Sequence, residues 1–173
     1  MAGLRTPTLG ACGLDCGLCP RYYSRGSSRC PGCGGEGFNL KHPPCGFLTC
    51  CQKREGLQVC AECGEFPCRR FDRESGARES FVTHRRVLPN QAFIREHGLE
   101  AFLAGQAGRM SFLETALALY DDGRSRNVFC LAAALLSAEG LSEALDRAGK
   151  GEDIRAALAG LAASEGQELK LRK

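Results

Sequence analysis

The chain has 173 residues, of which 43% are hydrophobic and 25% charged, and its formal net charge is +3. This size suits one domain or two small ones. No apolar run approaches the roughly 20 residues that cross a bilayer, and the N-terminus lacks the charged and apolar regions of a secretory signal peptide. We therefore expect a soluble cytoplasmic protein without membrane contact.

Cysteine is concentrated in the first part of the chain, where eleven of the twelve cysteines lie between Cys12 and Cys68. Most form C-x2-C or C-x3-C pairs, a spacing that lets two thiolates bind one tetrahedral ion through a tight turn. A disulfide scaffold is the alternative, but the short repeated pairs and the absence of an export signal favour a reduced, metal-loaded module. Because residues 1–70 contain few aliphatic side chains, we expect this module to depend on metal for its stability.

The spacing of the pairs predicts two zinc sites, hence about two Zn²⁺ per chain. Cys16, Cys19, Cys30 and Cys33 have the spacing of a zinc ribbon or knuckle pair, and Cys45, Cys50, Cys60 and Cys63 would close a second site. Cys12 and Cys68 are also candidate ligands, each able to replace a member of the nearer set. Spacing leaves open an arrangement in which the first and third pairs share an ion.

Cys51 and His42 are two further side chains that could bind metal. Adjacent side chains diverge in extended structure, so only one of Cys50 and Cys51 is expected to bind metal. His42, three residues before Cys45, could replace a cysteine, although a solvated loop histidine is the simpler interpretation.

Iron–sulfur chemistry is the alternative to zinc. The C-x3-C-x2-C spacing of Cys12, Cys16 and Cys19 would leave one iron of a four-iron cluster without a protein ligand, as radical S-adenosylmethionine enzymes require. Those enzymes need a large α/β barrel, and no alternation of strands and helices follows residue 70. A simpler iron–sulfur cluster with an electron-transfer or sensing role stays open, because sequence alone rarely separates it from zinc.

Charge argues against nucleic-acid binding. Residues 1–70 contain nine Lys and Arg against five Asp and Glu, a formal charge of +4, and the remainder carries −1. Each zinc bound by four cysteines contributes −2, so two centres would bring the first segment to about zero. Nucleic-acid recognition needs uncompensated basic residues. Closed four-cysteine sites also leave no coordination position for a substrate, which favours a structural or interaction role with an unidentified protein partner over an enzyme.

Four cysteine-containing segments resemble domain of unknown function family 3795, a family of bacterial and archaeal cysteine-rich proteins. They are GACGLDCGLCPRY (10–22), CPGCGG (30–35), CGFLTCC (45–51) and GLQVCAECGEFPCRRF (56–71). CAECGEFPC is the most specific of them, since it matches the family's C-x2-C-x-E-F-P-C block. Residues 82–103 and 121–136 resemble the helical extension of longer members, which takes the similarity from residue 10 to about 148. The family implies zinc binding without an established activity, and its pattern implies that Cys50, not Cys51, is the ligand.

Residues 71–173 are predicted to form an all-α helical bundle, which follows the small, zinc-ribbon-like or knuckle-like module of residues 1–70. Apolar residues at three- and four-residue steps between Leu99 and Tyr120 predict one amphipathic helix that ends near Gly123. The segment 125–137 is apolar on nearly all sides and should form the buried central helix.

Shorter helices are expected on either side. One should follow Pro89 and end at Gly98, covering about residues 90–97. Ser142 is the expected N-cap of another helix, and Asp153 begins a third. The tail of residues 164–173 is expected to be loose.

Overall fold

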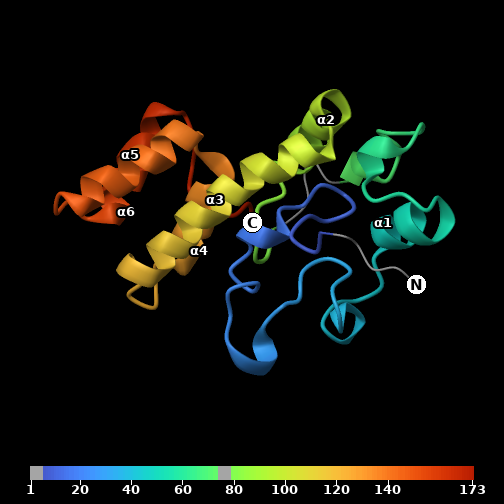
Figure 1. Ribbon diagram of the computed structural model, residues 1–173, viewed down its shortest axis with the longest axis horizontal. Helices are drawn as coiled ribbons and strands as arrows, with labels where there is room; N and C mark the ends of the chain where they lie inside the picture. Colours follow the sequence, from blue (N-terminus) through green and yellow to red (C-terminus); the bar gives the residue numbers. More distant parts are fainter. Residues whose placement is uncertain (1–5, 74–78) are drawn as a thin grey trace.

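A computed structural model describes residues 6–73 and 79–173, except for the side chains of Lys53 and Arg73. The described residues form six α-helices and no β-strand (Figure 1). The cysteine-rich segment consists of short turns. These are η1 (Cys16–Leu18), η2 (Gly26–Ser28), η3 (Phe38–Leu40), α1 (Gly46–Leu48), the π-helical turn η4 (Thr49–Arg54), η5 (Cys60–Glu62) and η6 (Phe71–Arg73).

The described residues from 79 onward are mainly helical, which confirms the prediction for the C-terminal part. Its helices are α2 (Val87–His97), α3 (Leu99–Tyr120), α4 (Arg126–Leu135), α5 (Ala138–Gly149) and α6 (Ile154–Ser164). In Figure 1 the turns of the cysteine-rich segment (blue to green) lie beside α2 and the near end of α3, whereas α5 and α6 lie at the other end of α3. No described helix combines the length and apolar character that a membrane span requires.

The main core lies between α3, α4, α5 and α6. Helix α4 is its central element, as predicted, and its Phe129 is completely buried together with the neighbouring alanines. Small alanine side chains allow the surrounding helices to approach α4 closely. Leu18 of η1 is part of the same core, so the turn that contains Cys16 packs directly against the helical part.

A smaller apolar cluster forms a second contact between the two parts. Leu9, Val59 and Ala61 of the cysteine-rich segment pack around Ile94 of α2. Leu99, Phe102 and Leu103 of α3 cover this cluster.

The helix starts differ from the predictions at two places. Helix α5 begins at Ala138, with Ser137 as the N-cap whose Oγ accepts a hydrogen bond from Gly140 N at 2.9 Å. The predicted N-cap, Ser142, is an exposed residue inside this helix, so that assignment is wrong. Helix α2 begins at Val87 and includes Pro89, because a first-turn residue needs no N–H for an intrahelical bond.

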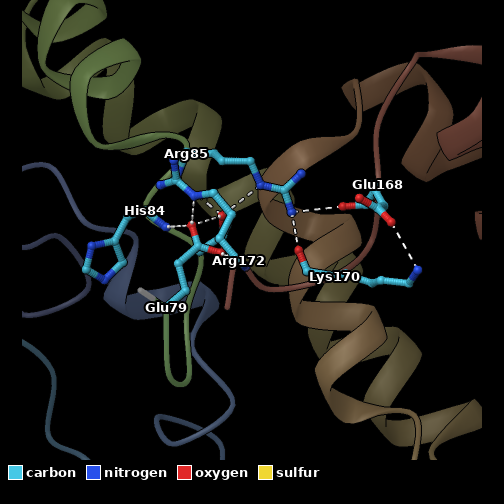
Figure 2. Close-up of polar contacts among 7 residues, drawn as sticks. Glu79, His84, Arg85, Glu168, Lys170 and Arg172 are labelled. Atoms are coloured by element: carbon cyan, nitrogen blue, oxygen red, sulfur yellow. Dashed lines mark hydrogen bonds and ion pairs between the residues drawn. The ribbon is translucent and has the colours of Figure 1, made fainter. Parts of the chain in front are cut away.

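The C-terminal tail is held in place, in contrast to the expected loose tail. Glu79, whose side chain is 0% exposed, accepts hydrogen bonds from the backbone N–H and the Nε of Arg172 at 2.8 and 3.1 Å (Figure 2). The same carboxylate accepts from Thr83 Oγ1 and from His84 N. Arg85 Nη2 donates to two backbone carbonyl oxygens that precede Arg172 in the tail, those of Glu168 and Lys170. The tail is therefore fixed by the segment that precedes α2.

Candidate metal centre

Two glycines shape the cysteine loops at positions that a side chain could not occupy. Gly32 has φ +84°, and a Cβ there would lie 2.1 Å from the carbonyl oxygen of Pro7. This close approach lets Cys33 N donate to the same oxygen at 2.9 Å. Gly13 has φ +95°, and its Cβ would lie 2.6 Å from Val87 O. The loop around Cys12 therefore lies directly against the start of α2.

One side chain of α2 joins two cysteine loops. Gln91 is completely buried, its Nε2 donates to Ala11 O at 2.9 Å, and its Oε1 accepts from Ala61 N at 2.5 Å. Ala11 precedes Cys12, and Ala61 lies between the two cysteines of the third C-x2-C pair. Gln91 thereby sets the distance between these loops.

A buried carboxylate anchors the first loop to the helices. Asp15 Oδ2 accepts from Asn90 Nδ2 at 2.7 Å, and its Oδ1 accepts from Gln106 Nε2 at 2.9 Å. Burial raises the pKa of Asp15, and these hydrogen bonds together with the charges of Arg86 and Arg109 partly oppose the rise. Asp15 thus connects the loop between Cys12 and Cys16 to α2 and α3.

The first group of cysteines contains Cys12, Cys16 and Cys33. The Cys16 thiol donates to the Cys33 sulfur; this bond and burial raise the pKa of Cys16, and nearby Cys12 adds to the rise. Accepting that bond lowers the pKa of Cys33 against the effect of burial, and the Ala11 N–H also donates to its sulfur. Backbone N–H groups directed at sulfur stabilise the thiolate form, which is the form that binds metal.

The second group contains Cys19, Cys30 and His42. The backbone N–H groups of Arg21 and Tyr22 donate to Cys19, although burial raises the pKa of this thiol overall, with nearby Cys30 contributing. His42 Nε2 lies 3.1 Å from Cys30 Sγ, and its ring stacks on Phe38. Burial lowers the pKa of His42, and the charge of Arg21 lowers it further. The histidine is therefore neutral, as metal ligation requires.

The third group surrounds one cavity in the last part of the segment. Five cysteines line this cavity, together with three phenylalanine rings: Cys50, Cys51, Cys60, Cys63, Cys68, Phe47, Phe66 and Phe71. Cys51 is only 3% exposed, and its Sγ lies 3.4 Å from Leu57 O. Cys60 donates to the Cys51 sulfur; this bond and burial raise the pKa of Cys60. The Phe71 ring contacts both other rings, with centroids 4.8 and 5.1 Å away.

The three observed groups combine the cysteines differently from the two predicted zinc sites, which followed the order of the chain. Cys16 pairs with Cys33 and Cys19 lies near Cys30, so the first predicted set contributes to two groups. Cys60 and Cys63 lie together with Cys50 and Cys68, whereas Cys45 is outside the residues that line the cavity.

Cys51 is the residue that the sequence reasoning set aside. That reasoning assumed extended structure, and this assumption is wrong because residues 46–54 are helical turns. In a helical turn, Phe47 and Cys51 are four residues apart and share a face, and both line the cavity. The four-residue spacing between Cys51 and the apolar Phe47 is the signal in the sequence that could have identified Cys51 as a cavity residue.

The chemistry of the donors fits a thiophilic ion, although the coordination geometry is not formed. Among the residues described, no three His, Cys, Asp or Glu side chains converge on a point that could hold a metal ion. None of the twelve cysteines, all of which lie in the described ranges, forms a disulfide. Thiolates, which accept hydrogen bonds from backbone N–H groups, and neutral imidazole are the ligands of zinc and iron–sulfur sites.

The fold and the site together define a cysteine-rich segment of short turns that packs on an all-helical part. The sequence model of the family described as "Protein of unknown function (DUF3795)" matches residues 8–73. The cysteine-rich segment therefore matches this family, as the resemblance in its motifs indicated. The match ends before α2, so it does not include the helical segments that also resembled longer members. Neither the curated proteins nor the solved structures that were searched contained a match.

Proposed function

We propose that the cysteine-rich segment binds metal ions through thiolates, with Zn²⁺ as the ion, and that these ions have a structural role. The observation that carries the proposal is the cavity around which five cysteines from two separate stretches of chain gather. A free cysteine packs as a small hydrophobic residue, so the metal-binding chemistry of five thiols around one cavity, and not their packing, supports the proposal.

Four of these thiols are the proposed ligands of one ion: Cys51, Cys60, Cys63 and Cys68. Cys51 is preferred to Cys50 because its sulfur is buried and bonded to the Cys60 thiol. Four thiolates close the coordination shell of zinc, so the ion would stabilise the segment without activating a substrate. A second ion is proposed among the cysteines of the first two pairs and Cys12.

The metal would take the place of a hydrophobic core in this segment. The buried apolar side chains around Leu9 and Val59 are few, and the α2 side of the segment is held by hydrogen bonds from Gln91 and Asn90. Ligation would stabilise the outer loops, which these contacts do not reach. A cytoplasmic protein with such a rigid, metal-bound face would present it to a protein partner, in line with the interaction role expected from the sequence.

Metal analysis of protein purified under anaerobic, reducing conditions tests the proposal. We expect a colourless protein with zinc, and loss of one equivalent in Cys63→Ser, while Ser27→Ala, at an exposed position, keeps the full content. A brown protein whose colour dithionite bleaches would show that the segment binds an iron–sulfur cluster instead of zinc. A well-folded protein that contains no metal would refute metal binding of either kind.

A further inference from the structure

A second cavity, of about 180 Å³, lies between α2 and α3, where the loop that contains Asp15 meets these helices. The lining residues of each helix recur at steps of three and four positions, so they share one face of that helix. From the α2 side these are Arg86, Asn90 and Phe93, and from α3 they are Phe102, Gln106 and Arg109. No cysteine lines this cavity, so it is separate from the candidate metal centre.

Arg109 is fixed in place with part of its guanidinium group open to a ligand. Its Nη1 donates to Ala133 O and to Leu136 O, both at 2.7 Å, at the end of α4. Among the described residues no acceptor binds its Nε or Nη2, and neither atom is a buried donor without a partner, so both are accessible. A guanidinium group that is held at one nitrogen and open at two others can bind both oxygens of a carboxylate.

Arg86 brings a second positive charge to the same cavity. In the described part of the chain, no hydrogen bond or ion pair engages its side chain. Burial lowers the pKa of Arg109, and repulsion from the charge of Arg86 lowers it further. An anion bound between the two guanidinium groups would replace this repulsion by attraction.

Asp15 does not neutralise these two charges by pairing with them. Its Oδ2 accepts from Asn90 Nδ2 at 2.7 Å and its Oδ1 accepts from Gln106 Nε2 at 2.9 Å, so amide groups bind both oxygens. Of the described residues, neither Arg86 nor Arg109 forms an ion pair with it. With Asp15 ionised, two arginines and one aspartate give the lining a formal charge of +1. This charge matches a ligand with one carboxylate.

Two phenylalanine rings provide an apolar wall beside the charged groups. The rings of Phe93 and Phe102 lie with their centroids 6.3 Å apart. Phe93 is 43% exposed, so its ring is available to a ligand. A cavity of about 150 Å³ can hold benzene, and this cavity of about 180 Å³ therefore has room for one ring or a short chain of similar size.

We propose that this cavity binds a small organic carboxylate, with the carboxylate between Arg86 and Arg109 and its apolar group against Phe93 and Phe102. The inference does not depend on metal binding by the cysteines. A ligand at this position would contact α2 and α3 at the place where Asp15 anchors the first cysteine loop to them. It would therefore stabilise the folded protein at that junction.

Isothermal titration calorimetry of the full chain with benzoate tests the inference, since benzoate combines one carboxylate with one ring. We expect saturable binding of benzoate and no binding of benzamide, its neutral analogue. Arg86→Gln should weaken benzoate binding by about tenfold or more, because it removes a charged hydrogen-bond donor. Arg124→Gln removes the same charge at an exposed position outside the cavity and should leave the affinity unchanged.

Two more variants test each end of the ligand separately. Arg86→Lys keeps the charge and should bind benzoate more tightly than Arg86→Gln does. Phe93→Ala removes part of the apolar wall, so it should weaken benzoate binding and leave acetate binding within about twofold of wild type. Because both side chains are partly or largely exposed, thermal melts of these variants should match that of the wild type.

Several results would overturn the inference. They are equal affinity for benzamide and benzoate, unchanged benzoate affinity in Arg86→Gln, and no saturable benzoate binding up to about 10 mM. Tighter binding of inorganic phosphate than of benzoate would also overturn it, because the site would then not select an organic carboxylate. A metal-free, folded protein that still binds benzoate would refute the proposed function and leave this inference intact.

Discussion

Replacing Gln91 by leucine should destabilise the protein at the junction of two cysteine loops. The leucine side chain has a similar volume, so it leaves little cavity, but it removes both hydrogen bonds of the Gln91 amide. The Ala61 N–H then stays buried without an acceptor, because Ala61 is only 6% exposed. Ala11 O is affected less, since it still accepts from Cys60 N at 2.8 Å.

The size of the effect follows from these two bonds. An orphaned buried N–H costs about 1–3 kcal/mol, and the lost bond to a carbonyl that keeps another donor costs about 1 kcal/mol. We therefore expect Gln91→Leu to lower the free energy of unfolding by roughly 2–4 kcal/mol. It should also speed metal release, because the loops of Cys12 and Cys60 would no longer be held together.

Urea unfolding of the metal-loaded protein, followed by circular dichroism, measures this difference. Ala92→Leu adds the same side chain at the next, exposed position of α2 and serves as the matched control, with an expected change within about 0.5 kcal/mol. If Gln91→Leu unfolded at the same urea concentration as the control, the role assigned to this side chain would be refuted.

Three other predictions concern the tail, the adjacent cysteines and one turn. Burial raises the pKa of Glu79, but the hydrogen bonds from Arg172, His84 and Thr83 outweigh it and lower the value. Its ionised form therefore stabilises the fold above the unfolded pKa, near 4.5, and this contribution is lost as pH falls through the lower folded value. Thermal melts of Glu79→Gln should show lower stability at neutral pH and a weaker decline in acid; a parallel decline would contradict this. In metal analysis, Cys51→Ser should lose an equivalent that Cys50→Ser keeps, and the reverse result would restore the sequence-based choice of Cys50. Gly32→Ala should reduce soluble yield and melting temperature, because its Cβ would lie 2.1 Å from Pro7 O; a wild-type melting curve would show that the turn adapts.

Local sequence was sufficient to predict several of the helices. Helix α3 runs from Leu99 to Tyr120 as its three- and four-residue apolar spacing predicts, and α6 starts after Asp153, whose Oδ1 accepts from Ala156 N at 2.9 Å. The buried position of residues 129–134 in α4 follows from their composition, since a segment that is apolar on nearly all sides has to be covered by its neighbours. These features depend on residues within one or two turns of each other.

The start of α5 depended on distant residues. Ser137 and Ser142 are both acceptable N-caps, and the difference is Glu165, which accepts from Ser137 N at 2.8 Å and from Ser137 Oγ at 2.6 Å across 28 positions of sequence. The ordered tail has the same origin, because Glu79 meets Arg172 only in the folded chain. No local pattern distinguishes these residues from solvated charges.

The same distinction between local sequence and distant contacts applies to the cysteines. Their number, their C-x2-C spacing and the glycines beside them are local properties, so the sequence by itself indicated that residues 1–70 form cysteine-rich turns that resemble the family. Which sulfurs lie together was decided by tertiary structure, because Gln91 and Asp15 set the loops against α2 and α3, and the helical turn at residues 46–54 directs Cys51 inward. Spacing constrains ligands within a pair through the short chain that joins them, whereas contacts between pairs depend on how the loops between them pack.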